Sequence, residues 1–503
     1  MSILAIDAGT TGVTALLVEH DGRVAATGYA EFTQYFPADG YVEHDLAEIW
    51  SATLAATRTA IADRAAEVTA IGITNQRETV AFWDRETLGA ARRAIVWQDR
   101  RTAALCDAMR RDEPRITELT GLRLDPYFSA TKLAWVREHD EHTWASVRSG
   151  RVALGTIDSY LIARMTRGVS HITDVTNASR TLLTDLDTGQ WNDELLRMFE
   201  IPRDALPEIT SSYGELAHTD PTAFLGLDVP ICGIAGDQQA ALVGQTGFDP
   251  GDTKCTYGTG SFLLANTGDH IARSRGGLLT TIALGHPDGR LSYALEGSVF
   301  VTGSAVQWLR DGLSIITSAE ETQSLAAQVP DAGGVVFVPA LTGLGAPDWD
   351  PTARGLIIGI TRGTTRAHLV RATLDAIAYS VRDVVALMRA DAGLALKQLA
   401  VDGGAAANDV LCQLQADQLN ADVNRSAQLQ TTGLGAAFLA GLGSGVWHSF
   451  DELRATRESS GVFTPRPVSP EGYLAWRDAV ERAKGWAVPR EPAHPIQQTP
   501  QRQ

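Results

Sequence analysis

The chain has 503 residues, too many for one hydrophobic core, and at about 150 residues per domain its length predicts two to four domains. Hydrophobic residues make up 44% and charged residues 20%, a balance typical of globular proteins that excludes a disordered chain. Lys and Arg number 43 against 60 Asp and Glu, and the net charge of −17 argues against an extended nucleic acid as a partner.

Cysteine usage and hydropathy indicate the cellular compartment of the protein. The four cysteines are scattered, with no C-x-x-C pair, which argues against a disulfide framework and against a zinc site. The first residues lack the basic segment of a signal peptide, and no run of about 18 apolar residues predicts membrane insertion. We therefore expect a cytoplasmic protein.

A hairpin opens the chain. The apolar run 3–6 stops at the polar turn 7–12, and apolar residues resume at 13–18 before a second turn at 20–22. This pattern predicts two strands joined by a turn rich in glycine and hydroxyl groups. Asp45 then predicts a helix N-cap, with Glu48 as its reciprocal partner in a capping box and apolar residues at helical spacing up to Ile61.

Strands and helices alternate along the rest of the chain. Residues 68–74 predict a strand, the apolar residues between Leu374 and Met388 mark one face of a long helix, and 399–401 predict a following strand. This alternation indicates an α/β fold.

A second hairpin echoes the first. Residues 253–257 lead into the turn 258–261, and an apolar run resumes at 262–264. The echo indicates either a duplication or a coincidence, since Gly-Thr turns are common. A duplication predicts domains at 1–247 and 248–488. Residues 489–503 are rich in Pro and Gln and predict a disordered tail.

Several nucleotide and hydrolase motifs are absent from the sequence. It contains no Gly-Lys dipeptide, hence no P-loop, and no G-x-G-x-x-G, H-E-x-x-H or G-x-S-x-G. Small-residue turns remain at 7–12, 258–261 and 402–408. Each is a common structural turn by itself, but such turns also let backbone N–H groups approach phosphate oxygens, and the carboxylate of Asp7 suits magnesium held through water.

Three such turns in an α/β chain resemble the actin-like (ribonuclease H-like) ATPase architecture, in which two related domains enclose a catalytic cleft that binds ATP. Longer motifs make the resemblance specific to the FGGY family of sugar and polyol kinases. They are ITNQRET at 73–79, IVWQDRRT at 95–102, DPYFS at 125–129, GDQQA at 236–240, YGTG at 257–260 and GLGAP at 343–347. Both family signatures are recognisable, one running from Tyr127 through Lys132 and Trp135, the other from Gly355 through Gly359, His368 and Asp375.

The resemblance is closest to the glycerol-phosphorylating members of the family, and it implies ATP-dependent conversion of glycerol to sn-glycerol 3-phosphate. A small uncharged triol calls for paired charged groups at its hydroxyls and aromatic walls around its carbons. Outside this family, an adjacent Arg and Glu predict an exposed ion pair, and single aromatic residues predict core positions. By family position, glycerol is held by Arg77, Glu78, Trp97, Tyr127, Asp237, Gln238 and Phe262.

The resemblance also implies roles in phosphoryl transfer. Asp237 is the expected catalytic base, a role compatible with capping the helix expected from Gln238. Asp7 is expected to organise Mg²⁺ through water, and ATP is the expected co-substrate. The expected nucleotide-binding residues are Thr10, Thr11, Gly258, Thr259, Gly303, Gln307, Gly404 and Asn408. Family members assemble as homodimers or homotetramers, which we expect here as well.

The sequence departs from the family pattern at three places. Thr14 stands where the family carries an arginine near the phosphates. This difference removes a cationic group that would stabilise the charge of the transition state by several kcal/mol at most. Residues 226–228 read Gly-Leu-Asp where bacterial members carry the Gly-x-Arg segment that binds fructose 1,6-bisphosphate, so we expect no inhibition by that compound. Residues 465–473 do not match the segment that binds the phosphotransferase-system regulator in enteric members.

Two other functions compete with glycerol phosphorylation. One is an FGGY kinase for another short polyol or ketose, which the combination of Arg77, Glu78, Trp97, Tyr127, Asp237 and Phe262 disfavours, because a larger sugar needs one wall opened. The other is a weakly catalytic nucleotide-binding regulatory protein, which only Thr14 favours.

Overall fold

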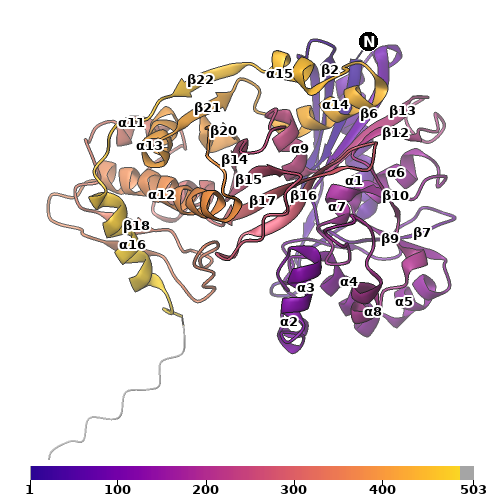
Figure 1. The fold of residues 1–503 in the computed structure, drawn as a ribbon, viewed down its shortest axis with the longest axis horizontal. Helices are drawn as coiled ribbons and strands as arrows, with labels where there is room; N and C mark the ends of the chain where they lie inside the picture. The colour runs from indigo at the N-terminus through magenta and orange to yellow at the C-terminus, as the bar shows by residue number, and fades with distance from the viewer. Residues whose placement is uncertain (1, 488–503) are drawn as a thin grey trace, which may run out of the picture.

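The computed structural model describes residues 2–487, and the tail predicted to be disordered at 489–503 lies outside these residues. Two lobes lie side by side, each built around a mixed β-sheet (Figure 1). No helix within 2–487 combines the length and apolar character needed to cross a bilayer.

The first sheet has six strands in the order β12-β13-β6-β1-β2-β3. Strand β1 runs antiparallel to β2 and parallel to β6, and β6 runs parallel to β13. The edge strands β3 and β12 run antiparallel to their neighbours. The strand bounds are β1 Ser2–Ala8, β2 Gly12–Glu19, β3 Val24–Glu31, β6 Val68–Asn75, β12 Tyr213–His218 and β13 Pro230–Gly236.

The second sheet has seven strands in the order β16-β17-β15-β14-β20-β21-β22. Strand β14 is antiparallel to β15 and parallel to β20, β20 is parallel to β21, and β22 is antiparallel to β21. The bounds are β14 Thr253–Tyr257, β15 Ser261–Gly268, β16 Leu279–Gly285, β17 Leu291–Val299, β20 Gln398–Asp402, β21 Asp422–Ser426 and β22 Ser459–Phe463.

The two sheets share one topology. If β16 is set aside, β3-β2-β1-β6-β13-β12 and β17-β15-β14-β20-β21-β22 have the same order and the same strand directions. This agreement favours a duplication over a coincidence of turns. It also places the two hairpin turns, 9–11 and 258–260, at corresponding ends of the central strands, where α/β sheets bind ligands.

The predicted helices are present, with one correction. The Asp45 side chain caps α1 (Leu46–Ile61) by accepting from the backbone N–H groups of Ala47 and Glu48. The reciprocal half of the capping box was wrong, because the Glu48 carboxylate instead accepts from the Thr33 N–H at 2.9 Å and the Tyr35 hydroxyl. The long helix predicted around 374–388 is α12 (Arg366–Ala392).

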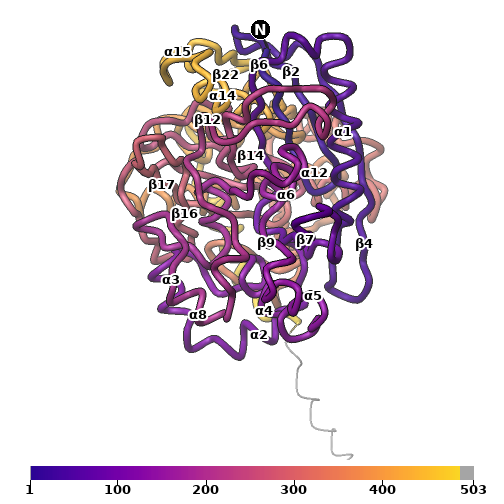
Figure 2. Tube along the Cα trace, turned by 90° about the vertical axis from the view of Figure 1, so that its right-hand side faces the viewer, coloured from indigo at the N-terminus to yellow at the C-terminus, as the bar shows by residue number. Residues whose placement is uncertain are grey.

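Helix α14 (Thr431–Ser444) comes from the second half of the chain but packs on strands β1, β6 and β13 of the first sheet (Figures 1 and 2). It also lies against α9 (Asp237–Gly244). Gly435 makes this approach possible, because a Cβ at that position would lie 1.8 Å from the carbonyl oxygen of Ala240. The division of the chain at residue 247 remains a prediction.

The remaining elements surround the sheets. Short strand pairs and triplets are formed by β4 Gln34–Tyr35, β5 Glu43–His44, β7 Ala81–Asp84, β8 Ala94–Ile95, β9 Val152–Gly155, β10 Ile172–Asp174, β11 Glu208–Thr210, β18 Val336–Val338 and β19 Leu356–Ile358. The other helices are α2 Ala103–Ala108, α3 Glu113–Thr120, α4 Ser129–His139, α5 Glu141–Arg148, α6 Ile157–Met165, α7 Val175–Ala178, α8 Asp193–Phe199, α10 Gly303–Gln307, α11 Glu321–Ala326, α13 Asp409–Leu419, α15 Phe450–Thr456 and α16 Glu471–Ala483.

Candidate active site

Arg77 and Glu78 follow the end of β6 and are buried, with side chains only 2% and 1% exposed, so they are not an exposed ion pair. Glu78 has a φ of 61°, the left-handed region that favours glycine. The Ser129 hydroxyl donates to the Glu78 carbonyl at 2.9 Å and stabilises this conformation. A strained residue at the end of a central strand is typical of a functional site.

The guanidinium of Arg77 is held from three directions. Its Nε lies 3.0 Å from Oδ1 of Asp237, and Nη1 donates to Gln239 at 3.2 Å. Nη1 and Nη2 also contact the two carboxylate oxygens of Glu296 at 2.5 and 3.2 Å. A guanidinium has five N–H donors. Among the described residues the hydrogen bonds to Gln239 and Glu296 use three of them, two on Nη1 and one on Nη2, and leave one N–H on Nη2.

Arg180 and Glu296 belong to the same charged cluster, and the sequence motifs did not identify either one. Arg180 Nε donates to Glu78 Oε1 at 2.7 Å, and Nη2 donates to Glu296 Oε1 at 2.8 Å. Its Nη1 has no hydrogen-bond partner among the described residues. The guanidinium carbon instead lies 5.3 Å from the ring centre of Phe128 and 5.8 Å from that of Tyr127, within cation–π range.

Burial and charge act in opposite directions on these carboxylates. Burial alone would raise the pKa of Glu296, but the positive charges of Arg180 and Arg77 outweigh it and lower the pKa to about 2. Burial raises the pKa of Glu78, and the same two arginines only partly oppose that shift. The surroundings therefore favour the ionised form of Glu296 more strongly than that of Glu78.

Asp237 begins α9, so the expectation that the helix starts at Gln238 is corrected by one residue, with Gly236 as the N-cap. Its Oδ1 accepts from the Gln238 N–H at 2.7 Å and faces Arg77 Nε. Oδ2 accepts no hydrogen bond from residues 2–487, and the side chain is 30% exposed. One carboxylate oxygen is thus fixed while the other is open to a ligand.

The three predicted aromatic residues lie together beside this cluster. The Trp97 ring lies 5.5 Å from Tyr127 and 6.4 Å from Phe262, both edge to face. Lys132 holds the Tyr127 segment by donating to the carbonyls of Pro126 and Tyr127 at 2.7 and 2.6 Å. Burial lowers the pKa of Lys132 to about 7.

Gln238 contacts a lysine that the sequence motifs did not identify. The buried Lys254 donates from Nζ to Oε1 of Gln238 and, at 3.0 Å, to the Thr256 hydroxyl. Because its oxygen accepts from Lys254, Gln238 directs its NH₂ group away from the lysine. Burial lowers the pKa of Lys254.

A cavity of about 680 Å³ lies in the second lobe, within the 300–1,000 Å³ usual for ligand pockets. Six of the eight predicted nucleotide-binding residues line it: Gly258, Thr259, Gly303, Gln307, Gly404 and Asn408. The N–H of Gly303 donates to the Gly258 carbonyl at 3.0 Å, and a Cβ at Gly303 would lie 2.6 Å from that oxygen. Thr10 and Thr11 belong to the other hairpin turn, outside this cavity.

Asp7 lies at the base of the first hairpin turn, close enough to Asp237 for the two charges to interact. Burial and, secondarily, the charge of Asp237 raise the pKa of Asp7 to about 7. Thr14 is the direct cross-strand partner of Asp7, so their side chains share one face of the sheet. At the departure in segment 226–228, the exposed Asp228 is hydrogen-bonded through Oδ1 to Nε2 of His218 at 3.0 Å.

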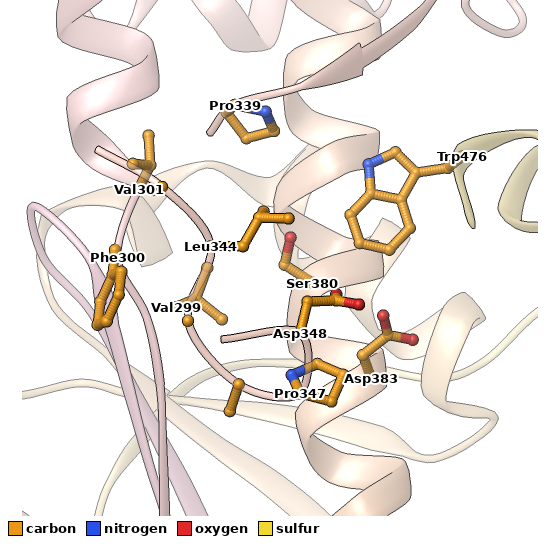
Figure 3. A pocket seen from close by; sticks show the side chains of 13 residues that line it. Val299, Phe300, Val301, Pro339, Leu344, Pro347, Asp348, Ser380, Asp383 and Trp476 are labelled. Atoms are coloured by element: carbon orange, nitrogen blue, oxygen red, sulfur yellow. The ribbon is translucent and has the colours of Figure 1, made fainter. Parts of the chain in front are cut away.

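A second hollow lies where segment 343–348 meets α12 and α16, between Asp348, Asp383 and Trp476 (Figure 3). Its volume is only about 30 Å³, the space of a single water molecule. Arg477 contacts both aspartates, at 3.0 and 2.8 Å, and thereby holds α16 on α12. This hollow is structural and does not compete with the larger cavity as a substrate site.

The two sheets share one topology, and each contributes a small-residue turn. Together with the buried charged cluster and the nucleotide-sized cavity, they define a two-domain kinase of the actin-like ATPase class. Profiles of the FGGY family of carbohydrate kinases match its N-terminal domain at residues 2–244 and its C-terminal domain at 253–444. The chain belongs to the FGGY family of carbohydrate kinases.

Curated relatives that match over nearly their whole length include glycerol kinases. The chain is 51% identical to that of Trichlorobacter lovleyi, covering 97% of this chain and 99% of the relative. It is 49% identical to that of Petrotoga mobilis, covering 96% and 98%. The crystal structure of Plasmodium falciparum glycerol kinase with ADP superimposes with a TM-score of 0.90 at 36% identity, covering 96% of this chain and 98% of that one.

Proposed function

We propose that the chain transfers the γ-phosphoryl group of ATP to a terminal hydroxyl of glycerol and yields sn-glycerol 3-phosphate. Glycerol kinases about half identical to this chain over nearly its whole length support the choice of acceptor. The site residues, the metal and the assembly below belong to the same proposal.

One observation carries the proposal: protein contacts fix the charged groups of Arg77, Glu78 and Asp237, yet each of the three keeps an atom for a ligand. Arg77 retains an N–H on Nη2, Asp237 retains Oδ2, and Oε2 of Glu78 accepts no hydrogen bond among the described residues. With the Tyr127 hydroxyl, these donors and acceptors suit the hydroxyls of a small triol. The Trp97 and Phe262 rings then cover its carbons.

Asp237 is the proposed base. Its open Oδ2 accepts the proton of the attacking hydroxyl, while Arg77 Nε and the Gln238 N–H hold Oδ1 in place. The fixed oxygen orients the other toward the acceptor, so the carboxylate needs little rearrangement in the transition state.

The nucleotide base and ribose fit the large cavity, lined on one side by Gly404 and Asn408. The phosphates then lie between the two hairpin turns, within reach of Thr259 on one and of Thr10 and Thr11 on the other. Backbone N–H groups and hydroxyls at such turns bind phosphate oxygens without needing a P-loop lysine.

Asp7 and Asp237 fit a magnesium ion. Their mutual repulsion, which contributes to the raised pKa of Asp7, would be relieved by a divalent cation. No group of three or more His, Cys, Asp or Glu side chains within 2–487 forms a cage for a metal, which agrees with the preference of Mg²⁺ for water and phosphate oxygens over all-protein sites. Bound Mg²⁺ neutralises charge on the transferring phosphoryl group.

We also propose a cytoplasmic location and a homodimeric or homotetrameric assembly. The four cysteines are free and buried, in keeping with a reducing compartment. The assembly rests on the family resemblance alone.

A coupled assay of ADP release with glycerol, erythritol, xylulose and dihydroxyacetone tests the proposed reaction. We expect turnover with glycerol well above the other three acceptors. A different preferred acceptor would assign the chain to another FGGY activity. Nucleotide binding without any turnover would make it a regulatory protein instead.

A further inference from the structure

Two glutamine amides, of the buried Gln76 and the partly buried Gln34, hold the first hairpin turn from behind. Nε2 of Gln76 donates to the Gly9 carbonyl at 2.9 Å, and Nε2 of Gln34 donates to the Thr10 carbonyl at 2.7 Å. Gln76 is 1% exposed. Because both carbonyls are engaged on this side, the backbone of the turn is held in one orientation.

His44 joins the two glutamines. Its Nε2 lies 2.7 Å from Oε1 of Gln34, and its Nδ1 lies 3.3 Å from Nε2 of Gln76. The amide directions set by the two carbonyls require Nε2 to carry the proton and Nδ1 to accept, which only a neutral imidazole can do. Burial lowers the pKa of His44 to about 4, in agreement with this assignment.

Trp97 closes the circuit on the glycerol side. Its indole Nε1 donates to the Thr10 hydroxyl at 3.0 Å, and its backbone N–H donates to the Thr79 hydroxyl at 3.2 Å. The Thr79 hydroxyl in turn donates a hydrogen bond to Oε1 of Gln76 at 2.9 Å. Donor and acceptor roles can be assigned to every group in this ring of hydrogen bonds without conflict. We call these residues, Gln34, His44, Gln76, Thr79 and Trp97, the turn network.

The turn network joins the two substrate sites. Trp97 is one wall of the proposed glycerol slot, and Thr10 is a proposed phosphate ligand. While its oxygen accepts from Trp97, the Thr10 hydroxyl keeps its proton for a phosphate oxygen. A ligand packed against Trp97 therefore favours the same Thr10 orientation that a phosphate needs.

We propose that the turn network couples the acceptor site to the phosphate site, with Thr79 and His44 as positioning residues that touch neither substrate. This inference rests on the proposed function. Coupling of this kind is reciprocal: an acceptor that tightens nucleotide binding is itself bound more tightly in the presence of nucleotide.

Isothermal titration of the full chain with a nonhydrolysable ATP analogue, with and without saturating glycerol, measures the coupling as a ratio of two Kd values. For the unaltered protein we expect glycerol to tighten the analogue about 5-fold or more, the lower end of typical allosteric coupling. Thr79→Val removes the link between Trp97 and Gln76 with little change of shape, and we expect the ratio to fall toward one.

Thr57→Val is the matched control. Thr57 is a buried threonine of α1 whose hydroxyl has no hydrogen-bond partner among the described residues, so this variant should keep the unaltered ratio. A purely structural role of Thr79 would weaken both Kd values equally and leave their ratio unchanged. That result, or a ratio of one in the unaltered protein, would overturn the proposal.

Gln34→Met tests the network from its other end if Thr79→Val does not fold. It removes the amide that holds the Thr10 carbonyl, and the ratio should fall in the same way. The proposed function fails separately: an unaltered protein that binds both ligands with coupling but never releases ADP would contradict glycerol phosphorylation and leave the network intact.

Discussion

Glu296 of strand β17 forms a two-bonded ion pair with Arg77, which follows strand β6 of the other sheet. This arginine of the first lobe, which we propose binds glycerol, is therefore oriented by a carboxylate of the second lobe. Arg180 shares the same carboxylate through Nη2, so Glu296 balances two buried positive charges. Residues of both lobes thus build the proposed acceptor site.

Glu296→Gln should remove the negative charge between Arg77 and Arg180 while keeping the size of the side chain. Breaking a buried ion pair of this kind costs about 3 to 5 kcal/mol, so we expect a much lower urea midpoint and a raised KM for glycerol. The control is Glu194→Gln, which breaks an exposed pair with Arg115 at 2.7 Å and should cost less than about 1 kcal/mol. Equal midpoints for the two variants would contradict the bracing role of Glu296.

Asp237→Asn should lower kcat by about 10²- to 10⁴-fold, because the amide cannot accept the hydroxyl proton. Steady-state kinetics with glycerol measure the loss. Circular dichroism and titration with a nonhydrolysable ATP analogue check that the fold and the nucleotide site persist. Full activity of this variant would refute the assignment of Asp237 as the base.

His44 should make stability depend on pH. Its pKa falls from 6.5 to about 4 on folding, so the unfolded chain binds more protons between these values and stability is lost as the pH falls from 6.5 toward 4. The contribution amounts to about 3 kcal/mol, or about 1.4 kcal/mol per pH unit. Urea midpoints of His44→Gln should depend less steeply on pH across this range. The exposed His142 offers the control, since His142→Gln should keep the original slope.

Thr14→Arg should restore a cation beside Asp7, its direct partner across strands β1 and β2. Transition-state charge would gain a stabilising group worth up to several kcal/mol, and we expect kcat to rise about 10-fold. Initial rates at saturating ATP and glycerol measure the change. An unchanged or lower kcat would mean that the site needs no positive charge at position 14.

Local patterns predicted much of the fold. The hairpins at 3–18 and 253–264 and the helix cap at Asp45 were each visible from alternation, turn residues and capping chemistry. The second half of the capping box was not, because the Glu48 carboxylate binds the Thr33 N–H, 15 residues away along the chain. A short stretch of sequence does not show whether a side chain will bind a local or a distant partner.

Motifs also indicated part of the proposed site, since Arg77, Glu78 and Asp237 lie within contiguous family segments. The motifs did not identify Arg180, Lys254 and Glu296, because each lies in an ordinary stretch of sequence and acquires its partner only on folding. A long-range ion pair has no spacing rule along the chain, and no sequence signal pointed to these three residues.

The sequence by itself determined the elements, the two small-residue turns and the family, because backbone conformation and motif chemistry are set by neighbours along the chain. Only the tertiary structure decided which charges face one another. The free energy of a buried carboxylate depends on its distance from a guanidinium and on the exclusion of water, and both arise when the two sheets and helix α14 pack together.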